Sequence, residues 1–251
     1  MQKTLNCFDE RGGIPYLNAH MSLSDIQFVA FFIVLHVVFL NLPKANYTRA
    51  MKLSRGVAAV ILSVVGFYGL FADLGQWRSA FIFHHTAGDA LESKLHFCML
   101  ICMGHFVADL LWLVLGKMRY GVALRRDLII HHVIGIIAFG YALHHEIAYV
   151  ACLITMASEV MPVTTGIGAY GQRVQNMDIV RSANRWRLKL LVWWRVPLWG
   201  TMAILSVRTL IFGAYPQDLF VAYILSTCGF VGLLLLDRFW IKQCIAAESN
   251  S

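Results

Sequence analysis

Charged residues are scarce in this sequence: they account for 14% of its 251 residues, whereas apolar residues account for 59%. A water-soluble domain of this length needs a far larger polar surface, so the composition excludes one and predicts a polytopic membrane protein. The opening MQKTLNCFDERGG also lacks an apolar run followed by a small-residue cleavage site. We therefore expect no removable signal peptide, and the first hydrophobic span should direct the chain to the membrane.

The cysteine spacings of zinc sites and disulfide frameworks are absent as well. The six cysteines lie mostly within apolar runs, and Cys98 and Cys102, which share a helix face, are interpreted as small packing residues. Two histidine pairs, His84–His85 and His144–His145, lie in loops and are isolated from each other. They have acidic residues nearby, namely Asp89, Glu92 and Glu146. Neither pair has the repeated spacing of a metal site, so we expect no bound metal.

Acidic residues are fewer than basic ones, and the formal net charge is +7. The basic residues lie in short loops between apolar spans, a pattern that serves membrane topology and anionic lipid headgroups. We therefore exclude nucleic acid as a partner. The segment GIGAYG, residues 166–171, matches a dinucleotide-binding loop, but it ends an apolar helix and follows no strand. We interpret this match as chance.

Seven apolar stretches are long enough to cross a bilayer, which takes about 20 helical residues. They cover residues 24–42, 56–73, 95–116, 127–143, 147–170, 189–213 and 218–241. The sequence therefore predicts an all-α fold, a polytopic membrane helix bundle with about seven transmembrane helices. Three residues, 144–146, separate the fourth and fifth spans, so these two either form an antiparallel pair that crosses twice or a re-entrant pair.

Basic residues alternate between the loops. The loops after the first, third and fifth spans, together with the tail, contain Lys44, Arg49, Lys52, Arg55, Lys117, Arg119, Arg125, Arg126, Arg173, Arg181, Arg185, Arg187, Lys189, Arg238 and Lys242. The opposite side has only Lys3, Arg11, Arg78 and Lys94, which nearby acids offset. Because cytoplasmic loops collect Lys and Arg, we expect a lumenal (outside) N-terminal segment at 1–23, a first helix and cytoplasmic loop at 24–49, a membrane domain at 50–242 and a cytoplasmic tail at 243–251.

Several ionisable residues fall inside the predicted spans, where each is costly and therefore a functional candidate. They are His36, His105, Asp109, Asp127, His131, His132, Glu159, Arg195, Arg208 and Asp237. From the helical rise, Asp109, His132, Arg195 and Asp237 lie about 8–12 Å from the basic boundary, and Glu159 lies deeper unless its span ends near Gly166. The sequence therefore predicts one polar cavity open to the cytoplasm. His36 and Arg208 lie apart from this group in the sequence and are interpreted as structural or interfacial.

Two adjacent histidines on a helix point about 100° apart, so His131 and His132 should have different partners. Asp127 lies one turn before His131 and is expected to accept its proton. His132 should face the cavity with Asp109 or Glu159, with polar atoms within about 8 Å of one another. A histidine held by a carboxylate can act as a general base or an acyl-accepting nucleophile. Hydrogen bonds that only join helices explain the same spacing equally well.

The segment GHFVADLLWLVLGKMRYGVALRRDLIIHHVIGIIAFGYALHHEIAYVACLITMASEVMPVTT resembles the TLC-domain family, and the resemblance extends over residues 50–242. In that family an aspartate precedes a His-His pair by some twenty residues, and an acidic residue follows the pair; here these are Asp109, His131–His132 and Glu159. Pro162, Asp237 and Arg208 also look like family positions. Ceramide synthases have His-Asp-x-x-Asp where this chain has Ser158-Glu159-Val160-Met161-Pro162, and the chain lacks their homeobox-like segment. It is more similar to the small TLC-domain proteins.

The resemblance implies lipid metabolism or membrane lipid homeostasis, in the endoplasmic reticulum or another endomembrane. One expectation is ceramide synthase-like acyl transfer from acyl-CoA to a lipid amine, with acyl-CoA as co-substrate and no bound cofactor. The expected catalytic residues are then His131, His132, Asp109, Glu159 and Asp127, and the expected substrate-binding residues are His105, Arg195 and Asp237. The alternative is a non-catalytic lipid sensor, transporter or cargo receptor. A G-protein-coupled receptor shares the crossing number and direction, but buried acid–histidine clusters suit it less well.

Overall fold

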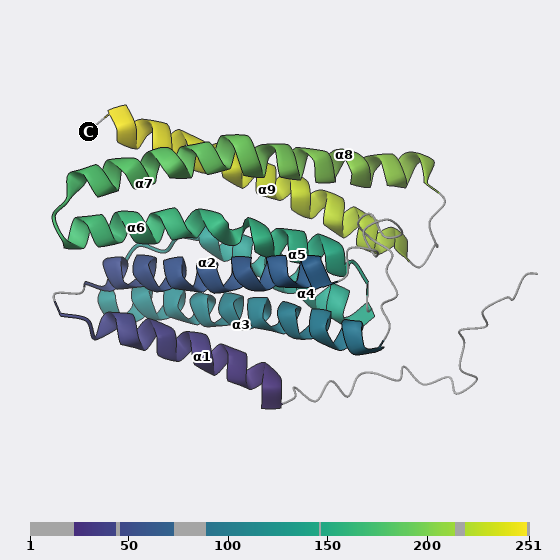
Figure 1. Cartoon of the computed structure of the whole chain (residues 1–251), viewed down its shortest axis with the longest axis horizontal. Coiled ribbons are helices and arrows are strands. Elements are labelled where there is room, and N and C mark those ends of the chain that lie inside the picture. The colour runs from purple at the N-terminus through teal and green to yellow at the C-terminus, as the bar shows by residue number, and fades with distance from the viewer. Residues whose placement is uncertain (1–22, 44–45, 73–88, 146, 214–218, 250–251) are drawn as a thin grey trace, which may run out of the picture.

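The computed structural model describes residues 23–43, 46–72, 89–145, 147–213 and 219–249, and all regular structure in these ranges is helical. The helices are α1 (Leu23–Leu40), α2 (Tyr47–Ala72), α3 (Asp89–Tyr120), α4 (Arg126–His145), α5 (Tyr149–Ala157), the 3-10 helix η2 (Ser158–Val160), α6 (Met161–Arg173), α7 (Met177–Leu190), the π-helix η3 (Leu191–Arg195), α8 (Val196–Phe212) and α9 (Phe220–Ser249). The predicted all-α fold is confirmed (Figure 1).

Six helical segments are long and apolar enough to cross a membrane: Tyr47–Ala72, Ser93–Tyr120, Arg126–His145, Tyr149–Arg173, Met177–Phe212 and Phe220–Glu248. A shorter apolar helix, Ile26–Leu40, lies where the first span was predicted. These lengths match the roughly 20 residues that a helix needs to cross the hydrocarbon core. The chain is therefore a multi-pass membrane protein with six candidate spans and one shorter apolar helix among its described residues.

The helices lie roughly along one direction, and the segments rich in basic residues share one end of the bundle (left in Figure 1). The end of α1, the start of α2, the end of α3, the α6–α7 turn and the C-terminal end of α9 all lie there. The predicted grouping of these segments on one side is therefore visible in the fold.

The predicted fifth loop is mostly helical, which corrects the sequence analysis. Residues 177–190 form α7, which continues through η3 into α8, and only 174–176 lie outside helices. The Asn176 side chain caps α7 by accepting hydrogen bonds from the backbone N–H groups of Asp178 and Ile179. Asn followed by an acid in the first turn is a helix start signal that the charge-based reading of this segment overlooked.

The fourth and fifth predicted spans do not pack as close partners, although the short hairpin led us to expect it. α4 packs mainly against α3 and α9, whereas α5 packs mainly against α2 and α3. α4 makes only sparse contact with α5, and a small apolar cavity lies between them with α9 as its third wall. A short connection fixes the ends of two helices but not the angle at which their axes diverge.

Glycines allow α2 to approach the α5–η2–α6 segment closely. A Cβ atom on Gly56 would lie 2.9 Å from the Cα atom of Gly166, and a Cβ atom on Gly66 would lie 2.5 Å from the backbone nitrogen of Ala157. These contacts hold α2 against the part of the chain that contains Glu159. Small residues at such crossings are typical of membrane helix pairs.

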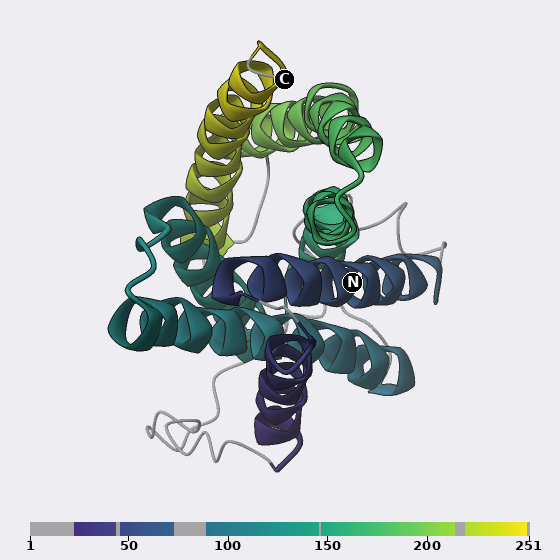
Figure 2. The ribbon, with the colours of Figure 1, turned by 90° about the vertical axis from the view of Figure 1, so that its left-hand side faces the viewer.

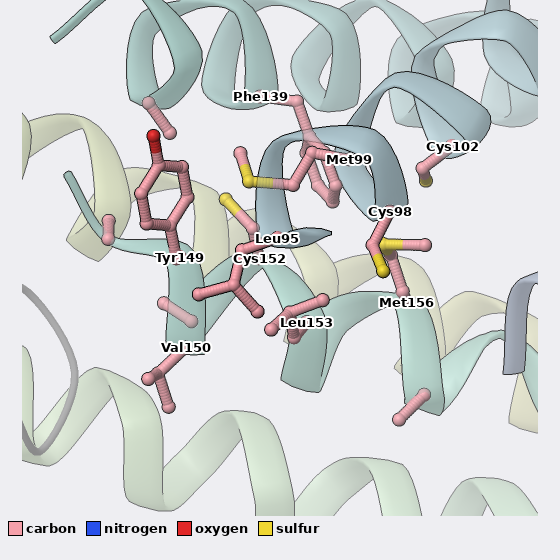
Figure 3. Close-up of a cluster of buried hydrophobic side chains, with 14 of the residues drawn as sticks. Leu95, Cys98, Met99, Cys102, Phe139, Tyr149, Val150, Cys152, Leu153 and Met156 are labelled. Carbon is pink, nitrogen blue, oxygen red and sulfur yellow. The ribbon is translucent and has the colours of Figure 1, made fainter. Parts of the chain in front are cut away.

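A buried apolar cluster joins α3, α4 and α5 (Figure 3). Cys98 and Cys102 of α3 lie in it with Phe139 of α4 and Leu153 of α5. Both cysteines are buried and free, so their predicted packing role is confirmed. Cys7, the pair His84–His85, the side chains of Asp89 and Glu92, and Glu146 lie outside the described residues.

Candidate functional site

Five helical segments bring buried polar side chains to one region of the bundle. Figure 2, which views the bundle from its basic end, shows the backbones of α2, α4, α6, α7 and α9 arranged in a ring. The buried polar side chains are His105 and Asp109 of α3, His131 and His132 of α4, Glu159 of η2, Arg195 of η3 and Asp237 of α9. The structure therefore brings together every predicted site residue except Asp127, which lies at the start of α4.

His132 and Asp109 form the shortest of three acid–histidine pairs in the described part of the chain. The Nε2 atom of His132 lies 2.7 Å from Oδ2 of Asp109. The other carboxylate oxygen accepts from Nε of Arg55 at 2.7 Å and lies 3.3 Å from Nε2 of His36. The predicted pairing of His132 with Asp109 is confirmed, and the Asp109 carboxylate has partners from α1, α2 and α4.

Arg55 and His36 are functional-site contacts that the sequence analysis did not identify. Arg55 was used only as a topological marker, although it stands directly before an apolar span. His36 was interpreted as structural; it is fully buried, and its Nδ1 atom lies 2.6 Å from the carbonyl oxygen of Phe32. A histidine within an apolar span is costly without a partner, and this was the signal that it faces another polar group. Arg208, by contrast, is exposed on α8.

His131 pairs with Glu159. Its Nε2 atom lies 3.4 Å from Oε1 of Glu159, and the same oxygen lies 3.8 Å from Nη1 of Arg195. Arg195 in turn donates through Nε to both carboxylate oxygens of Asp237, at 3.1 Å each. A row of contacts therefore runs from α4 to α9 in the order His131, Glu159, Arg195 and Asp237.

The predicted hydrogen bond between Asp127 and His131 is wrong. Asp127 accepts two hydrogen bonds from Arg125, at 2.9 and 2.5 Å, and one from Nε1 of Trp240 at 2.9 Å. The hydrogen bonds to Asp127 raise the pKa of the Arg125 guanidinium above its usual value. Asp127 lies in the first turn of α4, where the preceding loop and α9 can both reach it. The Trp240 ring that donates to Asp127 also lies edge-on to the His131 imidazole, at 6.0 Å between ring centroids.

A polar cavity of about 450 Å³ adjoins both histidines. Its polar lining consists of Tyr47, Thr48, Lys52, Arg55, His105, Arg125, His131, His132, Glu159, Thr165, Arg187, Arg195, Trp240 and Gln243. A cavity lined by polar residues, as predicted from their depth, is therefore present, and His105 and Arg195 lie in its wall. Asp109 and Asp237 are not part of the lining; each contacts a lining residue, Asp109 through His132 and Asp237 through Arg195.

A second cavity, of about 80 Å³, is almost entirely apolar. It lies between α4, α5 and α9, and its lining includes Phe106, Cys152, Phe230 and Leu233. His131 is a lining residue of both cavities. An ionisable side chain therefore stands where a polar space and an apolar space meet.

The Nδ1 atoms of both histidines are buried and have no hydrogen-bond partner in the described part of the chain. In each ring the Nε2 atom is the one beside a carboxylate. A neutral imidazole has one donor and one acceptor nitrogen, so a carboxylate at Nε2 places the proton there and leaves Nδ1 with a free lone pair. The site can therefore supply a base or a nucleophile.

Comparison with known proteins decides nothing further. No protein-family model, curated protein or solved structure matches this chain. The TLC-domain resemblance stays a prediction from the motif, and the function must be argued from the site. Within the described ranges, no three side chains of His, Cys, Asp or Glu come together as a metal site.

Proposed function

We propose that this chain is a membrane protein of lipid metabolism that transfers an acyl group from acyl-CoA to a lipid amine. The observation that carries the proposal is the position of His131 between two cavities of opposite character. Acyl-CoA has the same division, with a polyanionic head on one side of its reactive thioester and an apolar chain on the other. This assignment agrees with the function that the TLC-domain resemblance implies.

The polar cavity has the charge that a coenzyme would require. Lys52 and Arg187 line it and have no carboxylate partner among the residues described. Arg187 also has a buried Nε atom without a hydrogen-bond partner. Uncompensated cations at the boundary of a membrane domain favour an anionic ligand, and a phosphate supplies both the charge and the acceptor oxygens.

The orientation follows from the same charges. In our proposal α1 is a seventh crossing, the N-terminus is lumenal, and the basic end of the bundle faces the cytoplasm, where acyl-CoA is present. Residues 50–242 then form the TLC-like domain, and the protein resides in the endoplasmic reticulum or another endomembrane. The positive charge excess on one side supports this direction.

His131 is the better nucleophile of the two histidines. His132 is held by Asp109, which Arg55 and His36 hold in turn, whereas His131 lines both cavities. In the first step Nδ1 of His131 adds to the thioester carbonyl, and the carbon–sulfur bond breaks as CoA leaves as a thiolate. The Nε2 proton passes to Glu159, which leaves a neutral acyl-imidazole.

In the second step the lipid amine attacks the acyl carbon and the bond to Nδ1 breaks. Glu159 returns its proton to Nε2 of His131 as the imidazole leaves. The surplus proton of the amine neutralises the CoA thiolate, so the products are an amide and free CoA. His132 and Asp109 keep the start of α4 in place beside α3.

Purified protein in lipid nanodiscs, supplied with a long-chain acyl-CoA and a long-chain amine, tests the proposal. Mass spectrometry should detect the amide with the wild-type protein, and His131→Ala should abolish it. His132→Ala should reduce the rate, and Arg208→Gln, at an exposed arginine of α8, is the matched control and should not. An amide yield that His131→Ala leaves unchanged would refute the assignment.

A non-catalytic lipid sensor, transporter or cargo receptor is the second candidate. The network around Asp109 favours it, because His132, Arg55 and His36 all contact this one buried carboxylate, as groups that only join helices do. A lipid that copurifies with the protein and is lost on Lys52→Ala, in a preparation that makes no amide, would support this candidate.

A further inference from the structure

Most of the Arg195 side chain is used by the protein itself. It is 1% exposed, its Nε atom contacts both oxygens of Asp237, and its Nη1 atom donates to the carbonyl oxygen of Ser158 at 3.3 Å. Nη1 also lies 3.8 Å from Oε1 of Glu159. A guanidinium with two of its three nitrogens engaged in this way is fixed in place, which is more than a substrate-binding role requires.

The backbone presents Arg195 by a local departure from α-helical geometry. Residues 191–195 form a π-helical turn, in which the N–H group of Val196 bonds to the carbonyl oxygen of Leu191. Pro197 follows and cannot donate to the carbonyl of Trp193 four residues before it, so a wider turn suits this sequence. Such turns occur often at functional sites, and this one places Arg195 between η2 and α9.

Glu159 is shared between two ionic partners. Its Oε1 atom lies 3.4 Å from His131 and 3.8 Å from Arg195. Nε2 of His131 and Nη1 of Arg195 therefore approach the same carboxylate oxygen. Arg195 offsets part of the negative charge that Glu159 presents to His131, and Asp237 in turn offsets part of the charge of Arg195.

We propose that Arg195 is a positioning residue, which holds Glu159 beside His131 and is itself held by Asp237. The inference rests on the proposed function, in which His131 must be neutral to attack. Arg195 keeps the carboxylate near Nε2 while limiting its pull on a second proton. Asp237 limits the positive charge that Arg195 presents to Glu159, and it does so from outside the cavity lining.

Chemical modification of the histidines tests this role without any substrate. Diethyl pyrocarbonate reacts with neutral imidazole, and peptide mass spectrometry gives separate rates for His131 and His132 at pH 7 in nanodiscs. In Arg195→Gln the carboxylate of Glu159 keeps only His131 as an ionic partner, so we expect the His131 rate to fall at least about threefold. In Asp237→Asn the Arg195 charge loses its counter-ion, and the His131 rate should not fall.

His132 is the internal reference, because its carboxylate partner is Asp109 rather than Glu159. Its modification rate should stay within about twofold of wild type in both Arg195→Gln and Asp237→Asn. Arg195→Lys, which keeps the charge but cannot make both contacts, should lie between wild type and Arg195→Gln. Arg208→Gln controls for the loss of one positive charge. General loosening of the bundle would raise both histidine rates in both variants, and that result, or an unchanged His131 rate in Arg195→Gln, would overturn the proposal.

The readout separates this inference from the proposed function. If wild-type protein makes no amide but the His131 rate responds as expected, the acyl transfer is wrong and the positioning role stands. If amide forms and depends on His131 while the modification rates ignore Arg195, the acyl transfer stands and Arg195 is structural.

Discussion

Removal of the Arg55 side chain should destabilise the bundle by an amount set by the burial of its partner. Asp109 is completely buried, and its carboxylate oxygen Oδ1 lies 2.7 Å from Nε of the positively charged Arg55. Loss of one partner of a buried ion pair costs roughly 3–5 kcal/mol. The Arg55 side chain is 16% exposed, and His132 and His36 remain beside the carboxylate, so we expect Arg55→Gln to lie near the lower limit, about 3 kcal/mol.

The opposite substitution should be milder. In Asp109→Asn the guanidinium of Arg55 can reach the water of the polar cavity, which it already lines. The double variant should then lose less than the two single variants combined, with a coupling energy of about 1–3 kcal/mol. Equilibrium unfolding by SDS in mixed micelles, followed by tryptophan fluorescence, measures each free energy.

Arg208→Gln is the control, because it removes an exposed arginine from α8. The reasoning fails if Arg55→Gln is no more destabilising than Arg208→Gln. It also fails if the losses of Arg55 and Asp109 are simply additive, since independent effects would mean that the two groups do not stabilise each other.

Two further predictions concern helix packing and sidedness. Gly56→Ala should destabilise the bundle by about 1–3 kcal/mol in the same unfolding assay, because its Cβ atom would lie 2.9 Å from the Cα atom of Gly166; Gly200→Ala, with no atom within 4 Å of the added carbon, should be neutral or stabilising, and equal effects would contradict the close approach of α2 and α6. Asn46, which opens an Asn-Tyr-Thr acceptor sequence, should carry no glycan in cells because it lies at the basic end of the bundle; a mass shift on glycosidase treatment would reverse the proposed orientation.

Much of the fold could be predicted from local properties of the sequence. Long apolar runs specify membrane helices because every backbone polar group in lipid must find its hydrogen bond within the segment. Most ionisable residues within those runs are expected to face the interior, since exposure to lipid is costly, and Arg208 on α8 is an exposed exception. These two facts led to Asp109, His131, His132, Glu159, Arg195 and Asp237 as one buried group before any contact was known.

The choice of partners within that group depended on the tertiary structure. Spacing favoured Asp127 for His131, because residues four apart share a helix face, but Arg125 and Trp240 occupy that carboxylate. Glu159 reaches His131 because η2 presents its side chain to α4 across the cavity. Spacing describes one helix at a time, whereas partner choice depends on how each helix is rotated about its axis.

Helix divergence and cavities were likewise decided only in three dimensions. The hairpin at 144–146 suggested that α4 and α5 pack along their length, yet α9 approaches α4 and an apolar space remains between them. Hydropathy is the sum of single-residue properties and is blind to crossing angles, which follow from side-chain packing between several helices at once. The sequence alone therefore determined the apolar helices and most of the buried ionisable residues, and the packing of the helices determined that His131 lies between the polar cavity and the apolar one.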